Sequence, residues 1–335
     1  MRVVKDGAGT IRLSKTNQKH FGGVEVLGGT VLVGTTDSTS LAYLGVRGSE
    51  IVVRGDNSGS ASATSGVLDF EGVDGYTGYR VVLDGGAVHN AGLANVTDLR
   101  LASNSWIKTT TTTAANGTNY IGRADSPSFV DLGGHTLSAR VASGRMLCIY
   151  NATLDNGLLD VVSGGWFGTR GDNVATNASL RTTCGLDVNG TFQLRDYTHL
   201  QTNTGVNRGD GVIDVYGTFS TAVRLFHGTL LHDGATIDLA TNYTVDAPLP
   251  TVARFSSTSA TATGDKTLRF EPGATIGVKI GDRKVSNGTC LISWDDETAP
   301  DSTVKFVRAD EGRSYGLVRQ NDGLYVLAGF MLIVR

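Results

Sequence analysis

The densest group of side chains suited to ligand binding lies in the stretch GGWFGTRGDN, residues 164–173. Trp166, Phe167, Arg170 and Asp172 fall beside glycine turns within these ten residues. An aromatic face next to an arginine and an aspartate suits a sugar or a peptide, because Trp and Arg dominate binding hot spots. If Trp166 is buried, the same residues form a core plug followed by a turn. These four are the candidate binding residues, with the core plug as the alternative.

The tripeptide Arg-Gly-Asp occurs three times, at residues 54–56, 170–172 and 208–210. Composition alone predicts about 0.2 copies in a chain of this length. Exposed copies would mimic integrin ligands and promote adhesion to host cells. The alternative is structural, since Gly-Asp is a turn sequence and a repeat protein multiplies its turns.

Carboxylates are abundant, with 26 aspartates and six glutamates. Glycoside hydrolases need two carboxylates roughly 5–10 Å apart. The candidates closest in sequence are Asp69/Glu71, Asp155/Asp160 and Asp295/Asp296/Glu297. Aspartates also occupy chain corners, where they bond their own backbone amides. Because the chain carries no pectate lyase or polygalacturonase signature, no catalytic residue is assigned.

The six histidines and three cysteines are scattered along the chain. No Cys/His spacing indicates a metal site, and no phosphate-binding loop, dinucleotide fingerprint or nucleophile elbow is present. We therefore expect no metal and no cofactor. The formal net charge of −3 gives no reason to expect nucleic acid as a partner. No apolar run reaches 18 residues, so no membrane-spanning segment is expected.

The composition points to short strands as the elements that must position these residues. Glycine is abundant (45) and proline scarce (5). Asp outnumbers Glu, and Arg outnumbers Lys. Asp and Asn favour turns, whereas Glu and Lys are good helix formers. The sequence therefore predicts an all-β protein with many turns.

A repeating pattern of short strands and glycine corners appears at once, in residues 6–34. Strands are expected at 10–13, 24–27 and 30–33, and the last two are parted by Gly-Gly. Strands this short need another turn stacked above or below to bury their apolar faces. The device returns at 79–88, and the sequence Gly-Thr-Phe occurs at 190–192 and 217–219, 27 residues apart. We predict a solenoid of roughly a dozen turns, each of roughly 20–30 residues.

Residues 6–34 resemble the passenger-associated transport repeat of autotransporter proteins. The matching residues are Gly7, Gly9, Thr10, Ile11, Leu13, Ser14, Asn17, Phe21, Gly22, Gly23, Gly29, Thr30, Val31 and Val33. The resemblance implies a right-handed parallel β-helix in a bacterial surface or secreted protein. It implies no catalytic residues, because that repeat carries none.

The character of the sequence changes at Trp294, where the acidic stretch WDDETAP begins. The strands expected after it are joined by polar turns, including Asn321-Asp322-Gly323, which suits a tight antiparallel connection. We expect a single right-handed parallel β-helix over residues 1–293 and a β cap over 294–335. A cap covers the edge that an uncapped solenoid would expose.

These observations together predict a non-enzymatic β-solenoid passenger or scaffold, adhesin-like, that is extracellular or displayed on a bacterial surface. The expected partner is a host surface glycan or protein. The alternatives are a polysaccharide-degrading β-helix enzyme, either a lyase or a glycoside hydrolase, and a trimeric protein resembling a phage tailspike. The start MRVVKDG has no apolar stretch of signal-peptide length, and because the chain opens inside a repeat we expect it to be a piece of a longer precursor.

Overall fold

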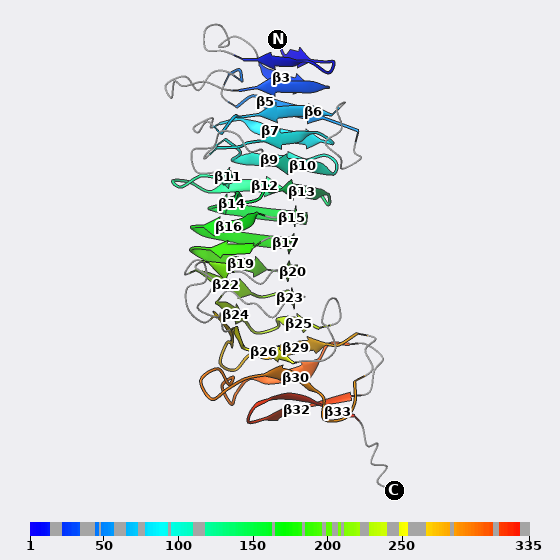
Figure 1. Ribbon diagram of the computed structural model, residues 1–335, viewed down its shortest axis with the longest axis vertical. Coiled ribbons are helices and arrows are strands. Elements are labelled where there is room, and N and C mark those ends of the chain that lie inside the picture. The colour runs from blue at the N-terminus through cyan, green and yellow to red at the C-terminus, as the bar shows by residue number, and fades with distance from the viewer. Residues whose placement is uncertain are drawn as a thin grey trace.

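The protein is built from strands and turns stacked along one long axis (Figure 1). The structure is a computed structural model that describes residues 1–13, 22–33, 44–46, 48–56, 65–72, 78–92, 95–109, 118–162, 165–182, 185–195, 199–202, 207–208, 211–221, 228–239, 248–253, 266–281, 285–310 and 315–328. These residues contain no helix, and none of their segments therefore forms a helix able to cross a membrane. The expected all-β, solenoid-like architecture is confirmed.

Parallel pairing produces a first ladder of strands along the axis. Its members are β1 (Val3–Lys5), β3 (Gly23–Val26), β5 (Glu50–Arg54), β7 (Arg80–Asp84), β9 (Asp98–Leu101), β12 (Ser128–Asp131), β15 (Ala152–Val162), β17 (Asp172–Thr182), β19 (Thr191–Arg195), β22 (Val212–Val215), β24 (Thr229–Leu231) and β28 (Lys266–Phe270). The short β27 (Val252–Ala253) pairs antiparallel with β28.

A second parallel ladder runs beside the first, and the two share the long strands β15 and β17. Its other members are β2 (Thr10–Arg12), β4 (Gly29–Leu32), β6 (Gly66–Asp69), β8 (Ala87–His89), β10 (Ser105–Lys108), β13 (Thr136–Arg140), β20 (His199–Thr202), β23 (Thr218–Thr221), β25 (Thr236–Asp238), β29 (Thr275–Lys279) and β31 (Lys305–Arg308). A third, shorter ladder consists of β11 (Thr118–Gly122), β14 (Met146–Tyr150), β16 (Trp166–Arg170), β18 (Gly185–Val188) and β21 (Asn207–Arg208).

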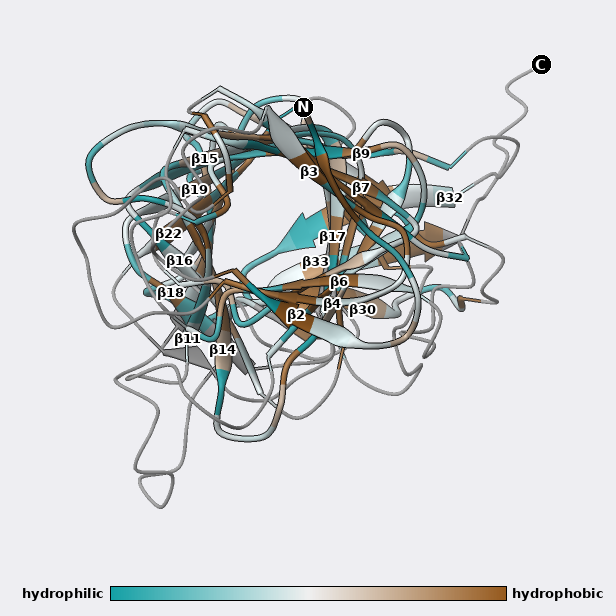
Figure 2. Ribbon diagram, turned by 90° about the horizontal axis from the view of Figure 1, so that it is seen from above, coloured by the Kyte–Doolittle hydropathy of each residue, from teal (hydrophilic) through white to brown (hydrophobic). Residues whose placement is uncertain are grey.

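The interior of the stack is filled by columns of aligned apolar side chains. In the first ladder Val24, Ile51, Val81, Leu99 and Val130 lie in register, one per rung. None of the five is more than 1% exposed. Burying one such side chain contributes roughly 1.5–3 kcal/mol. Viewed along the axis, the strands surround this common interior (Figure 2).

The spacing of paired residues gives the length of one turn. Thr30 lies 20 positions after its partner Thr10, and Arg181 lies 21 positions after Asp160. Other turns are longer, and Val67 lies 37 positions after Thr30. The 27-residue interval between the two Gly-Thr-Phe copies is not a repeat length.

The two Gly-Thr-Phe copies lie in different ladders, which explains why the interval between them is not the length of one turn. Thr191 begins β19 of the first ladder and pairs with Val212. Thr218 begins β23 of the second ladder and pairs with His199. The interval between them thus spans one full turn and the step from one ladder to the next. Sequence identity at a corner does not reveal which corner of the turn it occupies.

Glycines are required where two rungs approach closely at a corner. Gly66 pairs with Gly29, and a Cβ on Gly66 would lie 2.5 Å from the carbonyl oxygen of Val26. A Cβ on Gly86 would lie 2.6 Å from the Val53 side chain. The Gly-Gly corners predicted from the sequence therefore follow from the spacing between rungs.

A smaller sheet lies at the C-terminal end. It contains β26 (Leu249–Pro250), β30 (Cys290–Ser293), β32 (Tyr315–Gln320) and β33 (Gly323–Ala328). The antiparallel hairpin expected at Asn321-Asp322-Gly323 is present between β32 and β33. β30 precedes residue 294 and belongs to this small sheet, whereas β31 follows it and extends the second ladder. The two sheets therefore interleave in sequence around that expected boundary.

Candidate functional site

The structure places the four candidate residues of the 166–172 segment in different environments. Phe167 is 1% exposed and packs against Phe192, with 6.4 Å between ring centroids. Trp166 and Arg170 are half-buried at the two ends of β16, and Asp172 is exposed at the start of β17. Phe167 is thus a core residue, and the segment does not present one continuous binding face.

The Arg-Gly-Asp copies at 54–56 and 170–172 both sit at tight corners. Arg54 is paired with Glu25 at 2.9 Å and with Asp84 at 2.5 Å. Arg170 donates to the main chain and lies 3.4 Å from an Asp187 carboxylate oxygen. Both arginines therefore connect neighbouring strands. This agrees with the structural interpretation of the tripeptide as a turn sequence rather than an adhesion motif. The third copy lies partly outside the described residues, because residues 209 and 210 are not among them.

The corner glycine of the second copy is fixed by packing. Gly171 has a φ of +65°, and a Cβ there would lie 1.9 Å from the side-chain oxygen of Asn151. That oxygen accepts a hydrogen bond from the Asp172 main-chain N–H at 3.0 Å. The tripeptide thus belongs to an asparagine-stabilised corner.

Most of the carboxylates considered for catalysis are bound to other groups. Glu71 accepts two hydrogen bonds from Arg12, and Asp160 accepts two from Arg181. Asp69 accepts hydrogen bonds from the Glu71 main-chain N–H and the Asn90 side chain. These contacts hold turns and neighbouring rungs together. They occupy both carboxylates of the Asp69/Glu71 pair and one carboxylate of the Asp155/Asp160 pair.

One polar cluster on the outer wall is centred on His232. Its two ring nitrogens lie 3.1 Å from Asp214 and 3.2 Å from Glu271. Its ring stacks on Tyr216 with 4.0 Å between centroids, and the Arg195 guanidinium lies 5.7 Å from the centroid of that tyrosine ring. Both nitrogens are occupied, so the cluster ties successive rungs and leaves no nitrogen for a ligand.

That cluster could not be found from spacing within one strand. Asp214 and Glu271 lie 18 and 39 positions away from His232. Only the vertical register of the first ladder brings them together. Within the described part of the chain, no group of three or more His, Cys, Asp and Glu residues is arranged to hold a metal.

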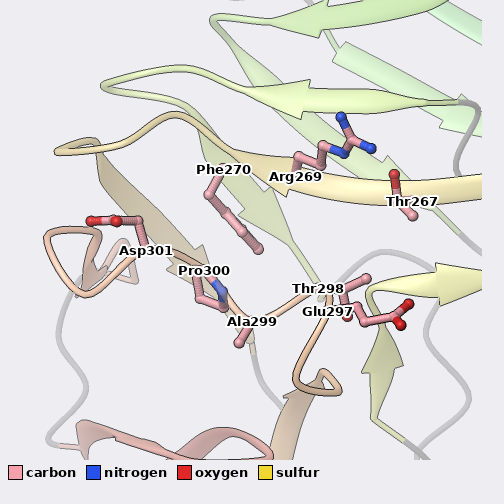
Figure 3. A pocket seen from close by; sticks show the side chains of 8 residues that line it. All are labelled: Thr267, Arg269, Phe270, Glu297, Thr298, Ala299, Pro300 and Asp301. Carbon is pink, nitrogen blue, oxygen red and sulfur yellow. The ribbon is translucent and has the colours of Figure 1, made fainter.

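A pocket of about 340 Å³ opens between β28 and the turn that follows Trp294 (Figure 3). Its lining consists of Thr267, Arg269, Phe270, Glu297, Thr298, Ala299, Pro300 and Asp301. Arg269, Glu297 and Asp301 are exposed at its rim, whereas Phe270 and Pro300 are buried. This combination of an apolar floor and charged rim is typical of small-molecule sites. Of its residues, sequence reasoning had singled out Glu297 alone.

The pocket wall is held in place by a set of contacts behind it. Thr298 donates to the Asp295 carboxylate at 2.7 Å and bonds to the Thr251 hydroxyl at 2.7 Å. Arg319 donates to the carbonyl oxygens of Pro300 and Asp301. The turn is therefore anchored from both sides.

Cys148 is predicted to be unreactive in the folded protein. It is 1% exposed in the third ladder, and burial raises the pKa of its thiol to about 12. Because the thiolate is the nucleophile, iodoacetamide at pH 8 should leave Cys148 unmodified. Peptide mapping by mass spectrometry resolves this site, and unfolded protein provides the positive control. Rapid labelling of Cys148 in folded protein would contradict its place in the core.

Comparison with family models, with curated proteins and with solved structures finds no match for this chain.

Proposed function

We propose that this chain is a single right-handed parallel β-helix that serves as a non-enzymatic scaffold. In this proposal it is secreted or displayed on a bacterial surface, in the manner of an adhesin. The observation that carries the proposal is the unbroken register of buried side chains along the first ladder, from Val24 through Val81 and Leu154 to Phe270. Close-packed interiors transmit strain and deform little, so such a stack suits a stiff support.

Two further observations support this function. The resemblance of residues 6–34 to a passenger repeat favours export, although Ser14, Asn17 and Phe21 of that motif lie outside the described residues. The ion pairs of Glu71 and Asp160 with arginines favour a structural role for those carboxylates over the hydrolase alternative. A rigid wall leaves loops and corner side chains as the surfaces that meet a partner.

We expect the purified chain to adhere to mucin-coated surfaces or host cells and to release no oligosaccharide from plant, mucin or bacterial polysaccharides. Adhesion is measured with fluorescently labelled protein, and release is measured by reducing-sugar assay and mass spectrometry. Oligosaccharide release that an Asp→Asn change abolishes would overturn the non-enzymatic proposal and favour the polysaccharide-degrading alternative.

Solution mass and circular dichroism provide the accompanying controls. A strand spectrum without helix is expected for folded protein. A mass close to 35.1 kDa would agree with a single-chain scaffold, whereas three times that mass would favour the tailspike-like alternative.

A further inference from the structure

The pocket beside β28 contains two charged side chains that have no partner in the part of the chain that the structure describes. Among the described residues, the side chains of Arg269 and Glu297 make no ion pair and no hydrogen bond. Some other arginines on the outer wall are paired with a carboxylate of a neighbouring rung, as Arg80 is with Asp98 at 3.0 Å and Arg181 with Asp160. Arg269 instead stands in register with Leu230. Its charge therefore has no carboxylate partner among the residues that the structure describes.

The geometry of the lining indicates what this charge could hold. An arginine side chain offers a planar fork of N–H donors that matches a carboxylate. Glu297 offers carboxylate oxygens that accept hydrogen bonds from hydroxyl groups. Pro300 and Phe270 provide an apolar floor for the C–H face of a ring. A ring that carries both a carboxylate and hydroxyl groups would use all three features.

The two carboxylates on the rim disfavour an anionic group that carries more than one negative charge opposite Arg269. Glu297 and Asp301 both line the pocket with Arg269, so the rim carries two negative groups and one positive group. A phosphate group near −2 would meet stronger repulsion from these two carboxylates than a singly charged carboxylate. A neutral sugar would leave the guanidinium without an ionic partner.

We propose that this pocket binds an acidic saccharide, with Arg269 pairing with a uronic acid carboxylate and Glu297 accepting from sugar hydroxyls. A volume of about 340 Å³ lies at the small end of the range for ligand sites, about 300–1,000 Å³, which suits one or two sugar units. The anchored turn presents the site preformed. This inference deepens the proposed scaffold function by naming a ligand class for one surface.

Isothermal titration of the purified chain with digalacturonate tests the proposal, with lactose as the neutral disaccharide of similar size. We expect digalacturonate to bind and lactose to bind at least about tenfold more weakly, because only the first supplies a charged partner. Arg269→Gln should lower digalacturonate affinity by about tenfold or more and abolish this preference. Arg269→Lys should give an intermediate affinity, since it keeps the charge but loses the planar fork.

Two further variants separate the pocket from general surface charge. Glu297→Gln should weaken digalacturonate binding, because a neutral amide is a weaker acceptor for the hydroxyls. Arg80→Gln removes an exposed arginine of β7, far from the pocket, and should leave the affinity unchanged. Thermal melting of each variant confirms that it is folded, since Arg269 and Glu297 are exposed and unpaired.

Three outcomes would overturn the proposal. They are no binding of digalacturonate, equal binding of digalacturonate by the parent and Arg269→Gln, or preferential binding of a zwitterionic dipeptide such as diglycine. The last outcome would assign the Arg269 and Glu297 pair to peptide recognition instead. If the pocket does not bind the saccharide, adhesion through other loops would still be detected in the adhesion assay. The two experiments therefore test the pocket proposal and the scaffold proposal independently.

Discussion

Phe192→Ala is expected to lower the free energy of unfolding by about 3–5 kcal/mol, the usual cost of truncating a buried phenylalanine. Phe192 is 1% exposed and packs against Phe167 of the third ladder. The substitution removes that contact and leaves a cavity that the rungs on either side cannot fill without moving. Urea denaturation followed by circular dichroism measures the loss.

The matched control is the same substitution on the outer wall. Phe129 is 38% exposed on β12, where its ring lies 5.9 Å from the Arg100 guanidinium. Phe129→Ala should change the free energy of unfolding by about 0.5 kcal/mol or less, as for most surface positions. Equal losses for the two variants would contradict the assignment of Phe192 to the interior.

Acidification is expected to destabilise the fold through His89. Burial lowers the pKa of this histidine from 6.5 to about 4, with Asp69 opposing the shift and Lys108 adding to it. Both neighbours come from adjacent rungs of the second ladder. The His89 Nε2 is also buried without a hydrogen-bond partner among the described residues, which agrees with a neutral ring held in the wall.

The sign follows from comparing the two states. Between pH 6.5 and pH 4 the unfolded chain binds a proton at residue 89 and the folded chain does not. The stabilisation is therefore complete above pH 6.5 and is lost as the pH falls towards 4, by about 3 kcal/mol in total.

His89→Leu removes that proton-binding site. The difference in unfolding free energy between the variant and the parent should shift in favour of the variant by about 3 kcal/mol from pH 7.5 to pH 4. Denaturation curves at several pH values give this difference and cancel the contribution of the aspartates common to both proteins. A difference that does not change with pH would show that His89 can be protonated in place.

The strand pattern of this fold could be read from the sequence because its causes are local. The strands predicted at 24–27 and 30–33 are β3 and β4, displaced by one residue. Gly29 between them has a φ of +66°, which explains why glycine marks the corner. Strand positions depend on the alternation of apolar residues and on glycine corners, which extend over only a few positions. The sequence of a single turn is therefore enough to predict its strands.

Contacts between turns could not be predicted in the same way. The pairing of His232 with Asp214, and the meeting of Arg269 with Glu297 at one pocket, depend on which residues fall in register across turns of unequal length. The 27-residue interval was wrong as a repeat length because its two Gly-Thr-Phe copies lie in different ladders, in β19 and β23. Trp166 and Phe167 are neighbours in sequence, yet alternation along β16 sends Phe167 into the core.

The direction of the interstrand hydrogen bonds has a mechanical consequence. In all three ladders these bonds join one turn to the next, so they run along the axis of the stack rather than across it. A force that pulls the two ends of the chain apart would break the hydrogen bonds of one rung before it loads those of the next. Each turn of about 20 residues would then release roughly 70 Å of extended chain. Such a stalk would yield stepwise under tension and extend far beyond its folded length before breaking.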